Sequence, residues 1–320
     1  MGVVVVIVVV VGVLVMTALL LAWGFQDWIL YMPRVPGAIY NRDPNENQER
    51  SLRSPKFYNW EYDEVFIDTA TPGVRLHAWI IYKLSDGLEP RNLPTVLFMH
   101  GNAGNIGHRL PFAEVVMLYS ESNIMLVDYR GFGLSTGSPS EEGLIEDAQC
   151  ALEYLQKCPD IDPDRIFLHG RSLGGAVCIG VANRLAALGP ATTVGFRGLI
   201  LENTFLSVRQ LVKDRVQEIV NTESEDIRDM CDKIVDTFVW LDWDSASRIT
   251  ALPEGLDVLF ISGSLDEIIP CDHMTKLYAL AGPNISKSML RVPLGDHNFS
   301  WGRLEYSRGL HSFLYDVCAK

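Results

Sequence analysis

The stretch RIFLHGRSLGGA at residues 165–176 decides the fold. It begins with a short apolar run, ends in small residues, and carries the pattern G-x-S-x-G around Ser172. This pattern is typical of a sharp turn from a strand into a helix, which exposes the serine hydroxyl at the carboxyl edge of a sheet. The sequence therefore predicts a buried strand over 165–170, a helix that follows it, and Ser172 as a nucleophile.

Five other short apolar runs accompany this one, and stretches of helical character separate them. Such runs are typical of strands that are buried on both faces of a parallel sheet. Two earlier segments alternate only partly, as expected of antiparallel strands at a sheet edge. We predict an α/β protein with a mostly parallel central sheet flanked by helices. The eight predicted strands lie at 62–68, 74–83, 95–100, 123–129, 165–170, 198–203, 257–263 and 288–293.

A serine hydroxyl needs a base, and the base needs a carboxylate that orients it. In α/β enzymes with such a turn, the chain order is serine, acid, histidine. His297 follows the last predicted strand, and Asp266 follows the strand before it. We therefore predict the triad Ser172, Asp266 and His297. Glu267 and Glu202 are kept as alternative acids.

Hydrolysis through a serine also needs two donors for the negative oxygen of the intermediate. The backbone N–H of Leu173, at the start of the predicted helix, is one candidate. The loop HGNAGN at residues 100–105 supplies the other, for which we choose the N–H of Asn102, with Ala103 as the alternative. No phosphate-binding pattern G-x-x-x-x-G-K-[ST] accompanies that loop.

Five motifs occur in the order seen in α/β-hydrolase domain proteins, and over residues 26–320 the chain resembles the Bem46-like group of that family. The resemblance implies the α/β-hydrolase fold and a triad made of Ser172, Asp266 and His297. Members of the group often have an N-terminal membrane anchor. The motifs are HGNAGN (100–105), DYRGFGLSTGSPSEEG (128–143), GRSLGG (170–175), SGSLDEIIP (262–270) and GDHN (295–298).

Residues 2–25 carry no charged side chain, and about 20 apolar residues suffice to cross a bilayer as a helix. We predict a transmembrane signal-anchor over 1–25, and hence a single-pass protein of an endomembrane or the plasma membrane. A cleaved signal peptide is the alternative. Few basic residues flank the segment, so the side of the membrane stays open. Whether the glycosylation sequon at Asn284 is used also stays open.

Three regions follow from composition. Residues 26–56 contain four prolines among polar residues and are predicted to form a linker. Residues 57–320 form the hydrolase domain. Within it, the charged helical interval 204–250 has two interpretations, a cap over the sheet or helices that pack directly on it.

Charge and cysteine usage exclude some classes of function. The net charge of −13, from 27 basic and 40 acidic residues, argues against nucleic-acid binding. The six cysteines show no zinc-ligand or disulfide pattern. We expect no metal and no organic cofactor.

The sequence thus predicts a membrane-anchored serine hydrolase that cleaves acyl ester or thioester bonds. Because the anchor would hold the enzyme at a bilayer, a lipid or acyl-protein substrate is favoured. Two alternatives stay open: a catalytically silent membrane scaffold, and a serine peptidase that uses the same triad.

Overall fold

The computed structural model of the protein describes four stretches of the chain, residues 23–33, 42–85, 87–189 and 195–320. Residues 1–22 of the predicted membrane anchor at 1–25 lie outside the described residues. Within those four stretches, every helix is too short or too polar to cross a bilayer.

The chain divides into two compact units. The larger unit takes in the described residues of Met32–Leu206 and Asp244–Lys320, and the smaller unit those of Met1–Tyr31 and Ser207–Trp243. All the residues predicted to act in catalysis belong to the larger unit.

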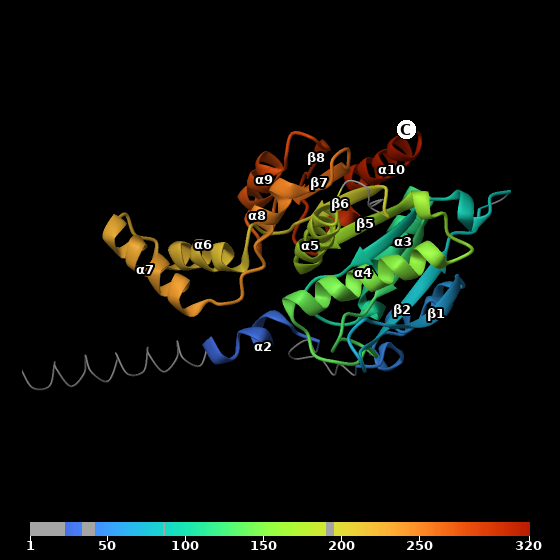
Figure 1. The fold of residues 1–320 in the computed structure, drawn as a ribbon, viewed down its shortest axis with the longest axis horizontal. Helices are drawn as coiled ribbons and strands as arrows, with labels where there is room; N and C mark the ends of the chain where they lie inside the picture. Colours follow the sequence, from blue (N-terminus) through green and yellow to red (C-terminus); the bar gives the residue numbers. More distant parts are fainter. Residues whose placement is uncertain (1–22, 34–41, 86, 190–194) are drawn as a thin grey trace, which may run out of the picture. The chain divides into compact units, whose positions relative to one another are not determined.

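An eight-stranded sheet forms the centre of the larger unit, in the order β1-β2-β4-β3-β5-β6-β7-β8 (Figure 1). β2 runs antiparallel to both β1 and β4, and the remaining neighbours are parallel. The sheet confirms the prediction of a mostly parallel sheet with antiparallel strands at one edge. The strands are β1 (Glu61–Asp68), β2 (Arg75–Tyr82), β3 (Thr95–Met99), β4 (Asn123–Val127), β5 (Ile166–Arg171), β6 (Gly198–Glu202), β7 (Asp257–Gly263) and β8 (Ser286–Val292).

Burial explains why the central strands are continuous apolar runs. Every residue of β3 through β7 is buried, so both faces of each strand need apolar side chains. Val96 and Phe98, which share one face of β3, pack in one cluster with residues of α3 and α10. The helices of this unit are α3 (Leu110–Ser120), α4 (Glu141–Lys157), α5 (Leu173–Ala187), α8 (Ser245–Arg248), α9 (Cys271–Leu280) and α10 (Leu304–Cys318).

The helices α4 and α5 lie side by side, as Figure 1 shows, because a glycine lets them approach. A Cβ added to Gly180 of α5 would lie 2.6 Å from Cδ1 of Ile145 in α4. Ser140 caps α4, since its hydroxyl accepts a hydrogen bond from the amide of Gly143 at 3.2 Å. The close packing of α5 fixes the helix that follows the predicted nucleophile.

Residues 42–58, which include most of the described part of the predicted linker, form three short turns of 3₁₀ helix. These are η1 (Pro44–Glu46), η2 (Arg50–Leu52) and η3 (Pro55–Tyr58). Asn47 follows η1 and is buried, and its Nδ2 donates to Leu52 O at 2.7 Å and to Asn105 Oδ1 at 3.1 Å. This part of the chain therefore packs against the loop at 100–105.

The smaller unit combines α2 (Gln26–Leu30), α6 (Val208–Val220) and α7 (Glu225–Phe238). The side-chain oxygen of Gln26 accepts from the amides of Trp240 and Leu241, at 3.0 and 3.2 Å. The indole of Trp243 is fully buried and donates to the hydroxyl of Tyr31 at 3.0 Å. Aromatic residues of the predicted helical interval thus tie this unit together.

Candidate active site

Ser172 stands alone between the end of β5 and the first residue of α5. Its backbone has φ 56° and ψ −122°, a region that costs a non-glycine residue about 1–3 kcal/mol and is found mainly at functional sites. Its amide donates to Glu202 O at 2.9 Å, and its carbonyl accepts from Gly175 N at 2.9 Å and Thr204 Oγ1 at 2.7 Å. These bonds hold the strained turn, and Ser172 as a residue is partly exposed.

Only glycine fits the two positions that flank Ser172 at a distance of two residues. A Cβ on Gly170 would lie 2.1 Å from the carbonyl oxygen of Gly174, and one on Gly174 would lie 1.9 Å from that of Met99. Both obstacles are backbone atoms, which cannot move aside as a flexible side chain can. The pattern G-x-S-x-G is therefore a steric requirement of this turn.

Replacing Gly170 by Ala should lower the free energy of unfolding by about 3 kcal/mol or more, because overpacking against backbone forces the turn apart. Urea unfolding followed by circular dichroism measures this change. The matched control is Gly302→Ala, since a Cβ at that position meets nothing within 4 Å. An equal effect of the two substitutions would show that the steric argument is wrong.

The imidazole of His297 pairs with the carboxylate of Asp266. His297 Nδ1 lies 2.8 Å from Asp266 Oδ2 and 3.0 Å from Oδ1. The side chains are 6% and 2% exposed, so water screens the pair little. The amides of Ile268 and Ile269 also donate to Asp266 Oδ1, at 2.9 and 2.8 Å, which fixes the carboxylate. Among the three carboxylates considered from the sequence, Asp266 is the one bonded to this imidazole.

The other two carboxylates have different partners. Glu267 accepts from the main-chain amide of His297 at 3.2 Å. Glu202 is fully buried, and its Oε2 lies 3.0 Å from His169 Nε2 and accepts from the hydroxyl of Tyr306 at 2.7 Å. Burial alone would raise the pKa of Glu202, but the bond and charge of His169 and the charge of Arg171 outweigh it and lower that pKa.

The loop at 100–105 lies beside Ser172. A Cβ added to Gly101 would be 3.6 Å from Cβ of Ser172. Tyr129 donates its hydroxyl hydrogen to His100 O at 2.8 Å, which fixes the start of the loop. Among the described residues, the main-chain amides of Leu173 and Asn102 donate no hydrogen bond.

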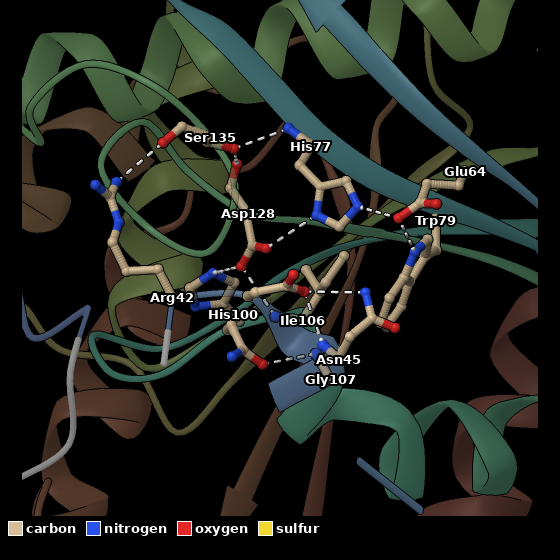
Figure 2. Close-up of polar contacts among 12 residues, drawn as sticks. Arg42, Asn45, Glu64, His77, Trp79, His100, Ile106, Gly107, Asp128 and Ser135 are labelled. Atoms are coloured by element: carbon tan, nitrogen blue, oxygen red, sulfur yellow. Dashed lines mark hydrogen bonds and ion pairs between the residues drawn. The ribbon is translucent and has the colours of Figure 1, made fainter. Parts of the chain in front are cut away.

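Asp128 holds the far end of this loop (Figure 2). Its Oδ1 accepts from the amide of Ile106 at 2.9 Å, and its Oδ2 lies 3.4 Å from His77 Nδ1. Its carbonyl accepts from the hydroxyl of Ser135 at 2.7 Å. The pKa of Asp128 is raised by its complete burial. The carboxylate therefore joins the loop after β3 to β2, and the main-chain carbonyl of Asp128 holds Ser135 in the loop after β4.

No family model matches the chain, but curated relatives do. It is 36% identical to protein bem46 of Schizosaccharomyces pombe over 253 residues, which cover 79% of this chain and 76% of that one. It is 34% identical to the α/β-hydrolase domain-containing protein WAV2 of Arabidopsis thaliana over 295 residues, or 91% and 87% of the two chains. The chain belongs to the α/β-hydrolase group of bem46 and WAV2.

Other similar proteins agree with the fold of this α/β hydrolase. The uncharacterized membrane protein YNL320W of Saccharomyces cerevisiae is 32% identical over 225 residues, 70% of each chain. Among solved structures, the Pyrococcus furiosus esterase Pf2001 matches with a TM-score of 0.59 and 18% identity, over 90% of this chain and 97% of that one. At this identity the likeness to the esterase shows the fold.

Two residues of this α/β hydrolase that hold the histidine loop were missed in the sequence. Asn203 follows β6, and its Nδ2 donates to the carbonyl oxygens of Asp296 and His297 at 3.1 and 3.2 Å, while its Oδ1 accepts from Gly263 N at 2.8 Å. Arg171 donates to the carbonyl of Asn298 at 3.0 Å. Their positions next to Glu202 and Ser172 at strand ends were the available signals.

The cysteines and other metal-ligand side chains form no second site within the described residues. No group of three or more His, Cys, Asp and Glu side chains there is arranged to hold a metal ion. All six cysteines are free thiols, and burial raises the pKa of Cys178 far above its usual value. Cys178 therefore acts as a small apolar residue of α5.

Proposed function

We propose that this α/β hydrolase is a membrane-anchored serine hydrolase that cleaves acyl ester or thioester bonds. The observation that carries the proposal is the short, shielded Asp266–His297 pair, at the same edge of the sheet as the strained Ser172 turn. A strained serine and an oriented imidazole are the parts that nucleophilic acyl transfer requires.

In the proposed reaction, His297 takes the proton of Ser172 through Nε2 while the serine oxygen bonds to the acyl carbon. Asp266 fixes the tautomer of the imidazole and stabilises its protonated form. The amides of Leu173 and Asn102 donate to the oxygen that becomes negative. The leaving alcohol or thiol then takes the proton from His297, and water cleaves the acyl-enzyme by the same route.

The substrate class rests on the N-terminal segment and on similar proteins. The uncharged residues 2–25 suit a membrane anchor, and one relative bears the name of a membrane protein. Since an anchored enzyme meets acyl chains at high local concentration, we favour lipid esters and acyl-proteins. Within the group, we also propose a relationship to α/β-hydrolase domain-containing protein 13, on the motifs quoted above.

A fluorophosphonate probe tests the reaction class, because it labels only a serine that a base has activated. The full chain should be labelled, peptide mapping should place the label on Ser172, and His297→Ala should remove it. Hydrolysis of acyl esters and thioesters of increasing chain length then measures the substrate preference. An unlabelled native chain would favour a silent scaffold, and cleavage of amides faster than esters would favour a peptidase.

A further inference from the structure

The loop between His100 and Ile106 is held by hydrogen bonds to its carbonyl groups. His100 Nδ1 lies 2.6 Å from Gly101 O, and the guanidinium of Arg109 donates to Ala103 O. Burial and the charge of Arg109 lower the pKa of His100 well below its usual value, so the ring is neutral. These partners all follow the predicted linker in the chain.

One further partner lies within the predicted linker at residues 26–56. The amide of Met32 donates to Asn102 O at 2.8 Å, and the amide of Gly104 donates to Met32 O at 3.0 Å. Met32 and Ala103 thus form an isolated parallel β-bridge. Both bonds use main-chain atoms only. The next residue is Pro33, and a following proline favours the extended backbone that such a bridge requires.

The bridge sets the direction of a peptide plane. In a trans peptide the carbonyl oxygen and the amide hydrogen point in opposite directions. Because the carbonyl of Asn102 points to Met32, the N–H of Ala103 in the same plane points away from it. In the preceding plane, the contact of His100 with Gly101 O fixes the direction of the Asn102 N–H in the same manner.

We propose that the main chain of Met32 is a positioning element of the oxyanion hole. It holds the loop so that the N–H groups of Asn102 and Ala103 are oriented before substrate arrives. The proposal rests on the serine-hydrolase function proposed above and extends it, since it makes a residue seven positions after the apolar segment 2–25 part of the catalytic apparatus. Donors fixed in advance are the ones that stabilise a developing charge best.

Met32→Pro in the full chain removes the donor of the first bond. We expect kcat for an acyl ester to fall about 10- to 100-fold, because losing or misplacing one oxyanion donor costs that order or more. KM should change less than about threefold, since the ground-state ester depends little on this hole. A second variant, with an ester in place of the Tyr31–Met32 amide, removes the same N–H without the constraint of a proline ring.

Binding of an alkyl boronic acid separates positioning from a general loss of structure. This inhibitor forms a tetrahedral adduct with the serine, and its affinity should fall in parallel with kcat in both variants. A lower melting temperature with unchanged kcat per folded molecule would overturn the proposal. So would an equal loss of kcat in Met32→Ala, which keeps both main-chain bonds.

Gln48→Pro is the matched control for the proline. Gln48 is exposed, and its main-chain amide donates no hydrogen bond among the described residues. The preceding Asn47 has φ −56° and ψ 144°, a backbone conformation that a following proline favours. We expect its kcat to stay within about twofold of the native value. If the native chain hydrolyses esters and the two proline variants have the same kcat, the positioning role of Met32 is wrong while the proposed function stands. If the native chain neither hydrolyses esters nor reacts with the probe, the proposed function itself fails.

Discussion

Ser172→Ala should lower kcat for an acyl ester by about 10⁵- to 10⁶-fold, the loss found when a triad nucleophile is removed. The substituted residue keeps Cβ and every main-chain bond of the turn, so substrate binding and the fold should change little. Initial rates at saturating ester, corrected for the folded fraction, measure the effect. A small residual rate is expected, because the oxyanion donors and the binding site still act on a water molecule.

The control for this substitution is Ser138→Ala, since Ser138 is exposed in the loop after β4. It should retain native kcat and native labelling by the fluorophosphonate probe. If Ser172→Ala kept more than about one-hundredth of native kcat, Ser172 would not be the nucleophile. The reaction would then have to use another group at the same sheet edge.

The strands were predictable because strands buried on both faces appear in the sequence as continuous apolar runs. The runs at 95–100 and 257–263 differ from β3 and β7 by one residue at most, since a strand buried on both faces needs an unbroken apolar sequence. The turn at Ser172 was predictable for a local reason as well. Two glycines meet backbone atoms there, and no other residue type fits.

The supports of the site were not predictable, because they join residues far apart in the sequence. Asn203 binds the carbonyls of Asp296 and His297, and Met32 binds the loop at Asn102. No local pattern marks such pairs. Chain order favoured Asp266 as the acid, because it follows the strand before the predicted histidine, but it left Glu267 and Glu202 as alternatives. Hydrogen-bond geometry is what separates them.

The helical interval 204–250 is another case in which a sequence pattern predicts an element but not what it packs against. The sequence predicts a charged helical stretch over 204–250, and the structure has α6 and α7 within that interval. The partner of their apolar side chains could not be read from the sequence. Trp243 is buried against Tyr31, more than 200 positions earlier in the chain.

Asp266→Asn should lower kcat about 10⁴-fold while the fold and KM stay near native, which is the order of loss when the triad acid becomes an amide. The amide can still accept from the backbone of Ile268 and Ile269, so the loop keeps its shape. It cannot stabilise a positive imidazole, and its NH₂ group favours the wrong tautomer of His297. Saturation kinetics with one ester, at several pH values, measure the loss.

Glu267→Gln and Glu202→Gln are the matched controls, because each turns one alternative carboxylate into its amide. Glu267 contacts His297 through one hydrogen bond, which it accepts from the main-chain amide of His297. The side-chain oxygen of a glutamine can accept the same bond. Its kcat should stay within about tenfold of native. Glu202→Gln should lower stability, since Glu202 is buried with His169 and Tyr306, but kcat per folded molecule should change less than about tenfold. A loss near 10⁴-fold in either control, with Asp266→Asn close to native, would move the role of the acid to that residue.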